Sequence, residues 1–505
     1  MRLTVRYGTL VKERAEIIVL GLFDAPQMDS TPKGFDKALG GMIARLIKSG
    51  DFRPELNKTF LLPTYGHLPT KRLLLIGLGK KSDFTLDRVR QAAGVAIKVV
   101  RRLGIKGVTS QLYPQQKNPV EQVSQAMVEG TMLGLYRFKR FKHLKPEEAR
   151  DVKALTIVVE DKGQLGGARA GARKGQLVAE AVCYARNLIN LPGSQATPRM
   201  LADEAKKAGS RLGFGVKVLS QDAMKRLGMN GLLSVASGSI QPPRFIVLEY
   251  GKKRPGWDTV VLVGKGVTFD TGGISLKPWR DMDKMKYDMA GAATVLGAFG
   301  ALARLRPRVH LVGLLPCAEN MPGGRAVKPG DIVSCMGGKT VEIVTTDAEG
   351  RLLLADALVY ARRYKPAAVM DLATLTGACI VALGYLAIGM LGNSEELKKR
   401  VKVAGDATRE RVWEMPLWEE YGESVRSDVA DVKNVGDYGA GVITGAKFLE
   451  QFVDKFPWVH LDIAGVAWAN KDGPYVIKGA SGTGVRLLVE LITSWKRLPA
   501  RGAKK

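Results

Sequence analysis

The stretch TTDAEGRL, residues 345–352, joins two predicted elements of different type and so decides the fold class. The preceding residues 340–346 are β-branched and apolar, which predicts a strand, and the apolar spacing from Leu352 onward predicts a helix. A charged triplet therefore lies at a strand-to-helix turn, a connection typical of α/β proteins. Taken alone, the stretch also fits a solvated acidic turn that caps the following helix.

Three charged side chains in this stretch are spaced so that they can meet. In an extended backbone, residues i, i+2 and i+4 project to the same side, and Asp347, Glu349 and Arg351 have this spacing. Gly350 would allow a sharp bend among them. Two acids and a base that face one point suggest a site for a cation with an anion beside it.

A second group of charged residues follows the predicted strand 259–264. Lys265 comes directly after the strand, and Asp270, Lys277 and Asp288 follow within the segment KGVTFDTGGISLKPWRDMDKMKYDM. Charged groups so close to a buried strand need partners, because burying an unpaired charge is costly. Exposed salt bridges would also satisfy them. A phosphate-binding loop is disfavoured, since neither GxxxxGKS, GxxxxGKT nor a complete GxGxxG is present.

Together the two groups contain four carboxylates, which would repel one another in one pocket unless cations neutralised them. Two divalent ions, about 3.5 to 4 Å apart, are a common solution. Nearly all the side chains on offer are oxygen ligands, and by softness alone these favour Mg or Mn over Zn. None of the four histidines lies in either motif.

Strand and helix signals alternate along the whole chain, which predicts an α/β protein. In the second part, the signals predict a mixed, mostly parallel sheet between layers of helices, with ligands at the carboxyl ends of the strands. The expected strands cover 15–22, 72–79, 155–160, 244–250, 259–264, 309–315, 367–372 and 459–463, and the expected helices cover 86–103, 290–305 and 395–410.

The chain is long enough for two or more domains. The segment 163–175, rich in Gly, Ala and Arg, marks the expected junction, and a helix is expected to begin near Thr197 and Pro198. The expected division is an N-terminal domain over 1–165, a linker helix and loop over 166–195, and a catalytic domain over 196–505.

Composition is that of an ordinary soluble globular protein, with 46% apolar and 25% charged residues among 505. No apolar run reaches the roughly 18 residues of a membrane span. The N-terminus has acids within its apolar part and no small-residue cleavage site, so a secretory signal is not expected. Four widely spaced cysteines without a CxxC pair are typical of buried thiols in a reducing cytoplasm.

The net charge of +28 is unevenly distributed. Residues 1–150 hold 27 lysines and arginines against 13 acids, a net +14, and so carry half of the charge on less than a third of the chain. The densest patch, YRFKRFKHLK at 136–145, alternates cations with aromatics and could follow a phosphate backbone. A solvated surface explains the same pattern. The candidate nucleic-acid contacts are Arg137, Lys139, Arg140 and Lys142.

The two charged motifs resemble those of the leucyl aminopeptidases of the M17 metallopeptidase family. The family signature is close to NTDAEGRL, and its other core motif has the form KGxTFDSGG followed by KP and MKYDM. This chain has TTDAEGRL, KGVTFDTGGISLKP and MKYDM in the same order, and the match extends over essentially the C-terminal half. The resemblance implies a macro-like α/β N-terminal domain and an α/β/α catalytic domain with a mixed, mostly parallel central sheet. It also implies a cytoplasmic homohexamer that acts on peptides.

The resemblance assigns metal-binding roles to five residues. Lys265 would bind the more exchangeable metal through a neutral amine. Asp270 and Glu349 would each contact both metals, and Asp288 and Asp347 would complete the separate shells. The cofactors implied are two divalent ions per subunit, zinc and/or manganese, with magnesium or cobalt as alternatives.

The resemblance also implies a reaction, the removal of the N-terminal residue of a peptide by a two-metal bridging hydroxide. Lys277 would polarise the scissile carbonyl and stabilise the oxyanion. Arg351 would hold a bicarbonate ion that accepts the proton of the bridging water. The pocket for the first side chain, small and apolar enough for Leu or Met, would be formed by Met285, Thr374, Gly377, Ala464 and Ala467.

Departures from the family pattern are few. Thr345 replaces an Asn of the signature, Thr271 replaces a frequent Ser, and Ala290 replaces a frequent Gly. None of them removes an expected ligand. Thr345 lies beside two ligands, where it would alter their orientation and hence the metal preference.

Two alternatives belong to other classes. The basic N-terminal part suggests a DNA-binding accessory or regulatory protein, a role that is compatible with peptidase activity. Clustered acids and lysines also suit a metal-dependent phosphatase. A phosphatase does not predict a lysine ligand at Lys265 and leaves the match to both motifs unexplained.

Overall fold

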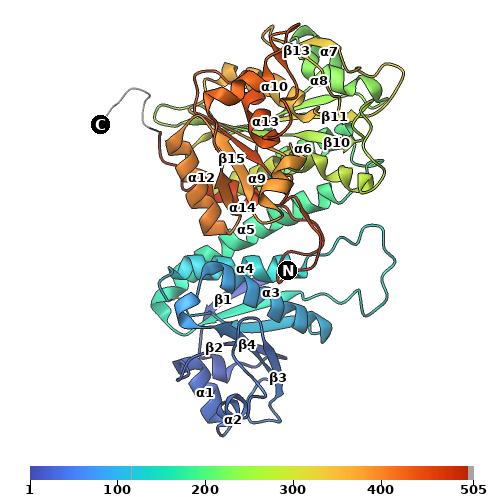
Figure 1. Cartoon of the computed structure of the whole chain (residues 1–505). Helices are drawn as coiled ribbons and strands as arrows, with labels where there is room; N and C mark the ends of the chain where they lie inside the picture. Colours follow the sequence, from blue (N-terminus) through green and yellow to red (C-terminus); the bar gives the residue numbers. More distant parts are fainter. Residues whose placement is uncertain (115, 499–505) are drawn as a thin grey trace. The chain divides into compact units, whose positions relative to one another are not determined.

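The computed structural model describes residues 1–114 and 116–498, and its contacts divide the chain into two compact units (Figure 1). Unit 1 comprises Met1–Glu180 together with Lys471–Lys478. Unit 2 comprises Ala181–Asn470 and continues from Gly479. Among the described residues, no helix is long and apolar enough to cross a membrane.

Unit 1 is built on a six-stranded sheet in the order β1-β6-β5-β2-β4-β3, in which β3 pairs antiparallel with β4 and the other pairs are parallel. Helices cover both faces, because Ile18 of β2 packs with Phe35 of α1, whereas the next residue, Val19, packs with Ile97 of α3. The strands are β1 (Arg2–Tyr7), β2 (Ile18–Phe23), β3 (Thr59–Pro63), β4 (Arg72–Gly79), β5 (Gly107–Gln111) and β6 (Ala154–Val159). The helices are α1 (Ser30–Ala38), α2 (Met42–Ser49), α3 (Leu86–Arg102), α4 (Val120–Leu135) and α5 (Leu165–Ile189), which continues into unit 2.

Unit 1 includes eight residues from far along the chain, Lys471–Lys478. This segment lies so close to α3 that a Cβ added at Gly94 would come within 2.6 Å of the Pro474 carbonyl oxygen. The Tyr475 side chain is buried, and its hydroxyl donates to Asp87 at 2.6 Å. The core of unit 1 is therefore completed by residues that follow most of unit 2.

Unit 2 contains a nine-stranded sheet with the path β16-β15-β18-β14-β9-β11-β8-β7, and β10 pairs with β11 beside this path. Its four central strands, β18, β14, β9 and β11, are parallel, and antiparallel pairs lie toward both edges. The predicted mixed, mostly parallel sheet is thus confirmed. The strands are β7 (Gly215–Leu219), β8 (Arg244–Tyr250), β9 (Thr259–Gly264), β10 (Gly266–Asp270), β11 (His310–Asn320), β14 (Ala368–Ala373), β15 (Ile388–Gly392), β16 (Val412–Glu414) and β18 (Trp458–Asp462).

Helices cover both faces of this sheet as well. Val312 of β11 packs in the same core cluster as α10, whereas a Cβ at the next residue, Gly313, would meet the Phe299 side chain of α9 at 2.8 Å. The helices are α6 (Pro198–Leu212), α7 (Gln221–Arg226), α8 (Asn230–Val235), α9 (Ala290–Leu305), α10 (Gly350–Ala361), α11 (Gly377–Leu383), α12 (Glu395–Thr408), α13 (Gly441–Glu450) and α14 (Val485–Thr493). Two small sheets are formed by β12 (Ile332–Ser334), β13 (Thr340–Glu342) and β17 (Val432–Lys433), and by β19 (Trp468–Ala469) and β20 (Gly479–Ala480).

One strand prediction is wrong over half of its length. The segment 340–346 was expected to be extended throughout, but β13 ends at Glu342. Beyond it, the backbone N–H groups of Val344 and Thr345 donate to the side-chain oxygen of Asn434. A side chain in a distant loop therefore takes the hydrogen bonds that a neighbouring strand would have taken.

Candidate metal centre and active site

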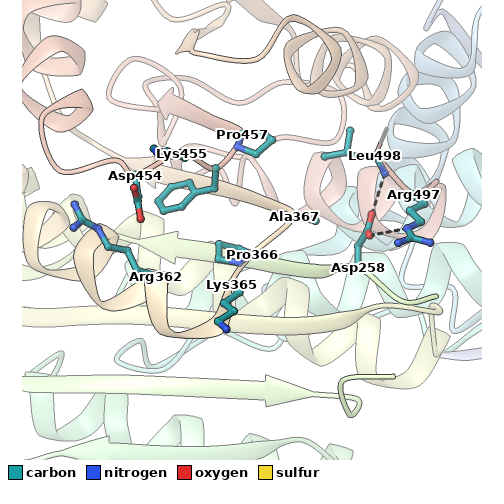
Figure 2. A pocket seen from close by; sticks show the side chains of 11 residues that line it. Asp258, Arg362, Lys365, Pro366, Ala367, Asp454, Lys455, Pro457, Arg497 and Leu498 are labelled. Carbon is teal, nitrogen blue, oxygen red and sulfur yellow. Dashed lines mark hydrogen bonds and ion pairs between the residues drawn. The ribbon is translucent and has the colours of Figure 1, made fainter. Parts of the chain in front are cut away.

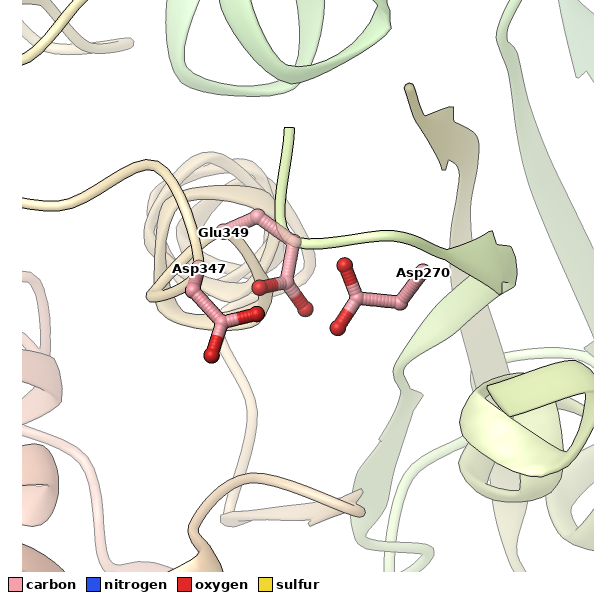
Figure 3. A group of neighbouring side chains, drawn as sticks. All are labelled: Asp270, Asp347 and Glu349. Carbon is pink, nitrogen blue, oxygen red and sulfur yellow. The ribbon is translucent and has the colours of Figure 1, made fainter. Parts of the chain in front are cut away.

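Acidic side chains from two distant segments meet at the carboxyl end of the central strands of unit 2. Asp270 ends β10, and Asp347 and Glu349 lie just before α10. Each offers one carboxylate oxygen, and these three oxygens all lie within 4.8 Å of one another. Figure 3 shows the three carboxylates pointing toward one another. This is the edge of the sheet at which ligands of α/β folds gather.

Two lysines hold these acids together. Lys265, which follows β9 directly, places its Nζ 2.9 Å from Asp288 and 2.8 Å from Glu349. Lys277 places its Nζ 2.9 Å from Asp270 and also pairs with Asp347. All six predicted metal-binding and oxyanion-stabilising residues are therefore brought together in one cluster.

Neutral donors orient the carboxylates further. The Asn320 amide donates to Asp270 at 2.8 Å and to the Thr346 carbonyl at 3.0 Å. The Thr374 hydroxyl donates to Asp288 at 2.6 Å. Asn320, at the end of β11, was missed in the sequence, although its place at the carboxyl end of a central strand is the signal that could have identified it.

The backbone that presents this cluster is not extended, contrary to the expectation from alternate spacing. Glu349 has φ −71° and ψ −38°, which is helical, so Asp347 and Glu349 converge through a turn and the first helical residue. Gly350 does not provide a bend with positive φ either. A Cβ at this position would lie 2.5 Å from Cε and 2.7 Å from Nζ of Lys265, so the glycine leaves room for the lysine.

Burial and charge shift the pKa values across the cluster. Burial raises the pKa of Asp347 to about 6 and that of Glu349 to about 7, and it also raises the pKa of Asp288. Burial lowers the pKa values of Lys265 and Lys277, but the surrounding carboxylates raise them by more, so both lysines stay charged. Nearby positive charge would therefore stabilise the ionised carboxylates, and their oxygens are ligands that suit divalent cations.

Arg351 lies in the first turn of α10 but turns toward another partner. Its Nη1 donates to the Asn434 carbonyl oxygen at 2.5 Å, and its Nε is buried without a hydrogen-bond partner among the described residues. Burial lowers its pKa to about 10, although Glu349 and Asp462 act in the opposite direction. Nothing in the local sequence around Asn434 indicates that it would hold both this arginine and the turn before α10.

The five predicted pocket residues come from three segments of unit 2. Met285 lies in the short 3-10 helix Met282–Met289 and is partly exposed. Thr374 lies in the loop after β14, Gly377 is the first residue of α11, and Ala464 and Ala467 lie in the segment after β18. Within these loops, the Thr374 hydroxyl is engaged by Asp288, and Ala467 is buried.

The basic patch 136–145 has neither helix nor strand. Two of its candidate nucleic-acid contacts, Arg137 and Lys139, pair with the same carboxylate, Asp151, at 2.8 and 2.7 Å. The Cζ atom of Arg140 lies 5.7 Å from the centroid of the Phe141 ring. Lys142 is exposed. Part of the patch charge is therefore neutralised locally.

A cavity of about 780 Å³ lies elsewhere in unit 2 (Figure 2). Its lining includes Asp258, Ala367 and Pro457, which immediately precede β9, β14 and β18. It therefore opens at the amino ends of central strands, whereas the carboxylate cluster lies near their carboxyl ends, and none of the predicted site residues lines it.

Comparisons with known proteins point in one direction. The model of the cytosol aminopeptidase family catalytic domain matches residues 183–489, and that of its N-terminal domain matches residues 19–145. A probable cytosol aminopeptidase of Geobacter sulfurreducens is 50% identical over 94% of this chain and 95% of its own length. Another probable cytosol aminopeptidase, from Roseiflexus castenholzii, is 44% identical over 98% of this chain and 99% of its own length.

Solved structures agree with the sequence matches. A tomato leucine aminopeptidase mutant has a TM-score of 0.87 and 32% identity, covering 98% of this chain and 96% of its own. The bottromycin maturation enzyme BotP in complex with Mn has a TM-score of 0.84 and 32% identity, covering 95% and 99%.

Proposed function

The chain belongs to the cytosol aminopeptidase family and is accordingly a metal-dependent aminopeptidase, and we propose that it removes N-terminal leucine and other apolar residues from peptides. The observation that carries this proposal is the meeting of three carboxylates with two buried or half-buried lysines at the carboxyl end of the central strands. Such a set is poorly suited to a purely structural role, because its acids repel one another.

The residues present fit two divalent cations. Asp270 and Glu349 would each contact both ions, Asp288 and Asp347 would complete the separate shells, and Lys265 would contribute a neutral amine. The ions would be zinc or manganese, with magnesium or cobalt as alternatives. When bound, they would supply a bridging hydroxide as nucleophile and polarise the peptide carbonyl. Because the carboxylates now favour the charged form of Lys265, its deprotonation depends on the positive charge of the ions.

Two further residues of this chain act on the reacting groups. The Lys277 side chain is 21% exposed while its ammonium contacts Asp270 and Asp347, so it can reach a substrate carbonyl at the edge of the cluster and stabilise the oxyanion. Arg351 would hold a bicarbonate ion through its buried guanidinium and so keep a proton acceptor beside the cluster.

Substitution of Lys277 and Asp347 tests the site. Lys277→Ala and Asp347→Ala are expected to lower kcat for a leucyl chromogenic amide by about 10²–10³-fold, since each removes a charge that acts on the transition state or the metals. Lys328 and Asp331 form a similar pair, 3.2 Å apart, on the surface, and alanine at either should leave kcat unchanged. Wild-type rates in both site variants would refute the assignment.

The preference for the first residue is tested separately. Purified enzyme loaded with Mn or Zn is expected to cleave leucyl and methionyl amides with higher kcat/KM than glycyl or aspartyl amides, because the proposed pocket is small and apolar. Equal rates on acidic and apolar first residues would contradict the pocket while leaving the peptidase activity intact.

Assembly and compartment extend the proposal. We propose a homohexamer in the cytoplasm, supported by the family membership and by the names of the relatives, which are cytosol aminopeptidases. The four free cysteines agree with a reducing compartment. Light scattering of the purified chain should give six times the mass of one subunit, and a monomeric mass would refute the hexamer.

DNA binding through unit 1 is a second candidate, motivated by the net +14 of residues 1–150. Retardation of duplex DNA should weaken with salt and with neutralisation of Arg137, Lys139, Arg140 and Lys142. Alanine at the exposed Lys252 and Lys253 of unit 2 serves as the control. Absence of retardation near physiological salt would eliminate this function.

A further inference from the structure

One fully buried carboxylate, Asp462, joins the two segments, one after β14 and one after β18, that lead to four of the five proposed pocket residues. Asp462 is the last residue of β18 and is 0% exposed. Its Oδ1 accepts the backbone N–H groups of Leu375 at 3.2 Å and Ala464 at 3.1 Å. Its Oδ2 accepts the backbone N–H of Thr376 at 3.1 Å and the Thr376 hydroxyl at 2.7 Å.

These four contacts link the β14–α11 loop to the segment after β18. The first contains Thr374 and leads into Gly377, the first residue of α11, and the second contains Ala464 and Ala467. Because β14 and β18 are neighbours, with Ala373 opposite Asp462, both loops leave the sheet at the same level. The distance between them is then fixed by one carboxylate that binds both.

The linked loop also touches the metal centre. The Thr374 hydroxyl donates to Asp288 at 2.6 Å, and the Thr374 carbonyl accepts from Lys265 at 2.9 Å. Thr376, two residues later, caps α11 through its side chain, which accepts from Cys379 N at 3.1 Å. Displacement of this loop would therefore move the pocket wall and the start of α11 relative to the cluster.

All four groups that face Asp462 are donors, so its oxygens act as acceptors and the carboxylate form is the one that fits. No lysine or arginine forms an ion pair with it among the described residues. Burial raises the pKa of Asp462, and the charge that most opposes this rise is that of His460, two residues earlier on the same strand face. His460 is itself fully buried and bonded to Asp371 at 2.5 Å. The backbone of Asp462 is thus fixed by its place in β18, and its carboxylate accepts hydrogen bonds from Leu375, Thr376 and Ala464.

We propose that Asp462 is a positioning residue that sets the width of the pocket for the first side chain and thereby the preference among apolar residues. The inference rests on the proposed function, because it assumes that the two loops form this pocket. Asp462 acts through Thr376 and Ala464 and does not touch the substrate.

The test compares kcat and KM for leucyl, methionyl, valyl and alanyl amides with metal content and thermal unfolding. Thr376→Val removes both one donor to Asp462 and the acceptor that caps α11, with the side-chain shape kept, whereas Thr376→Ser keeps both contacts and Asp462→Asn leaves the cap in place. We expect Thr376→Val to raise KM for the leucyl amide and to lower the leucyl-to-alanyl ratio of kcat/KM by about tenfold, the scale of one or two methylenes in an apolar pocket. Thr376→Ser should restore the ratio.

Asp462→Asn should lower the same ratio further, because an amide nitrogen would face donors, while two metal ions per subunit stay bound. The control is Thr408→Val, which removes an equally buried hydroxyl that donates to Ala404 on α12. An unchanged ratio in a folded, metal-loaded Thr376→Val enzyme would overturn the proposal. A wild-type enzyme that cleaves none of the amides would instead refute the proposed function.

Discussion

Gly350 illustrates how a single residue permits the whole cluster. Its missing side chain leaves the space that the Lys265 stem occupies, and Lys265 in turn contacts Asp288 and Glu349. Helix propensity alone would favour alanine here. The glycine is therefore required by close packing of a charged side chain against the start of α10.

Gly350→Ala is expected to lower aminopeptidase kcat/KM at least tenfold and to weaken metal binding, because the added Cβ displaces Lys265 Nζ. Steady-state kinetics and a metal titration by calorimetry measure the two effects. Gly422→Ala is the matched control, since a Cβ there meets no atom within 4 Å. Normal metal affinity in Gly350→Ala would show that Lys265 is not a ligand.

At the scale of single residues, the charged members of the cluster could be predicted, and their neutral partners could not. Lys265, Asp270 and Asp347 stand out because charges next to a buried strand or a tight turn need a reason. Asn434 has no such signal, since an asparagine in a loop is common. Its role arises only when folding brings it beside the turn before α10.

At the scale of elements, β14 and β18 are joined by a fully buried pair. Asp371 and His460 lie opposite each other in the two strands, and Asp371 also accepts from the Trp458 indole at 2.7 Å. Burial lowers the pKa of His460, whereas Asp371 and Asp462 raise it and Arg351 lowers it, and its pKa lies above the ordinary value overall. The pair therefore favours the charged imidazole.

This pair predicts a pH dependence of stability. A pKa that is higher in the folded than in the unfolded chain adds stability that is complete below the unfolded value and is lost as pH rises through the folded value. The free energy of unfolding, measured by urea titration, should be higher for wild type than for His460→Gln by about 3–5 kcal/mol at pH 6, as expected when one partner of a buried pair is removed. The difference should be smaller at pH 9. A difference that does not depend on pH would contradict a charged His460.

Elements with continuous apolar runs were predictable, several of them to the residue, although β2 begins three residues later than expected and β11 extends five residues further. The strands expected over 72–79, 244–250 and 259–264 coincide with β4, β8 and β9, because burial on both faces leaves an unbroken hydrophobic signature. The expected helix 290–305 likewise coincides with α9. The strand expected over 340–346 was too long, because β-branched residues do not reveal that Asn434 replaces the neighbouring strand. The order of strands in either sheet depends on long-range pairing that no local pattern contains.

At the scale of the whole molecule, metal binding should contribute to stability. Four carboxylates gathered in one place repel one another, and ions that bind only the folded chain stabilise it by about 2.7 kcal/mol at a concentration 100 times the dissociation constant. Chelation is expected to lower the thermal unfolding midpoint and abolish activity, and added Mn should restore both. The unfolding midpoint of the Asp347→Ala variant should fall less on chelation than that of wild type. A midpoint unaffected by chelation in wild type would argue against metals in this cluster.

The two domain boundaries expected near residues 165 and 196 stay a prediction, and the contacts add a feature that the sequence does not suggest. Lys471–Lys478 belong to unit 1, although most of unit 2 lies between them and the rest of that unit. Periodicity within eight residues cannot reveal which distant helix they will cover.

This returning segment has a consequence for biosynthesis. The first 180 residues are synthesised long before the residues that pack on Gly94 and Asp87. Unit 1 therefore cannot complete its core until Lys471–Lys478 have been made. Nascent unit 1 would expose that face of α3 to chaperones until translation passes Lys478. A chain released before Lys471 would carry every residue of the carboxylate cluster together with an unfinished unit 1.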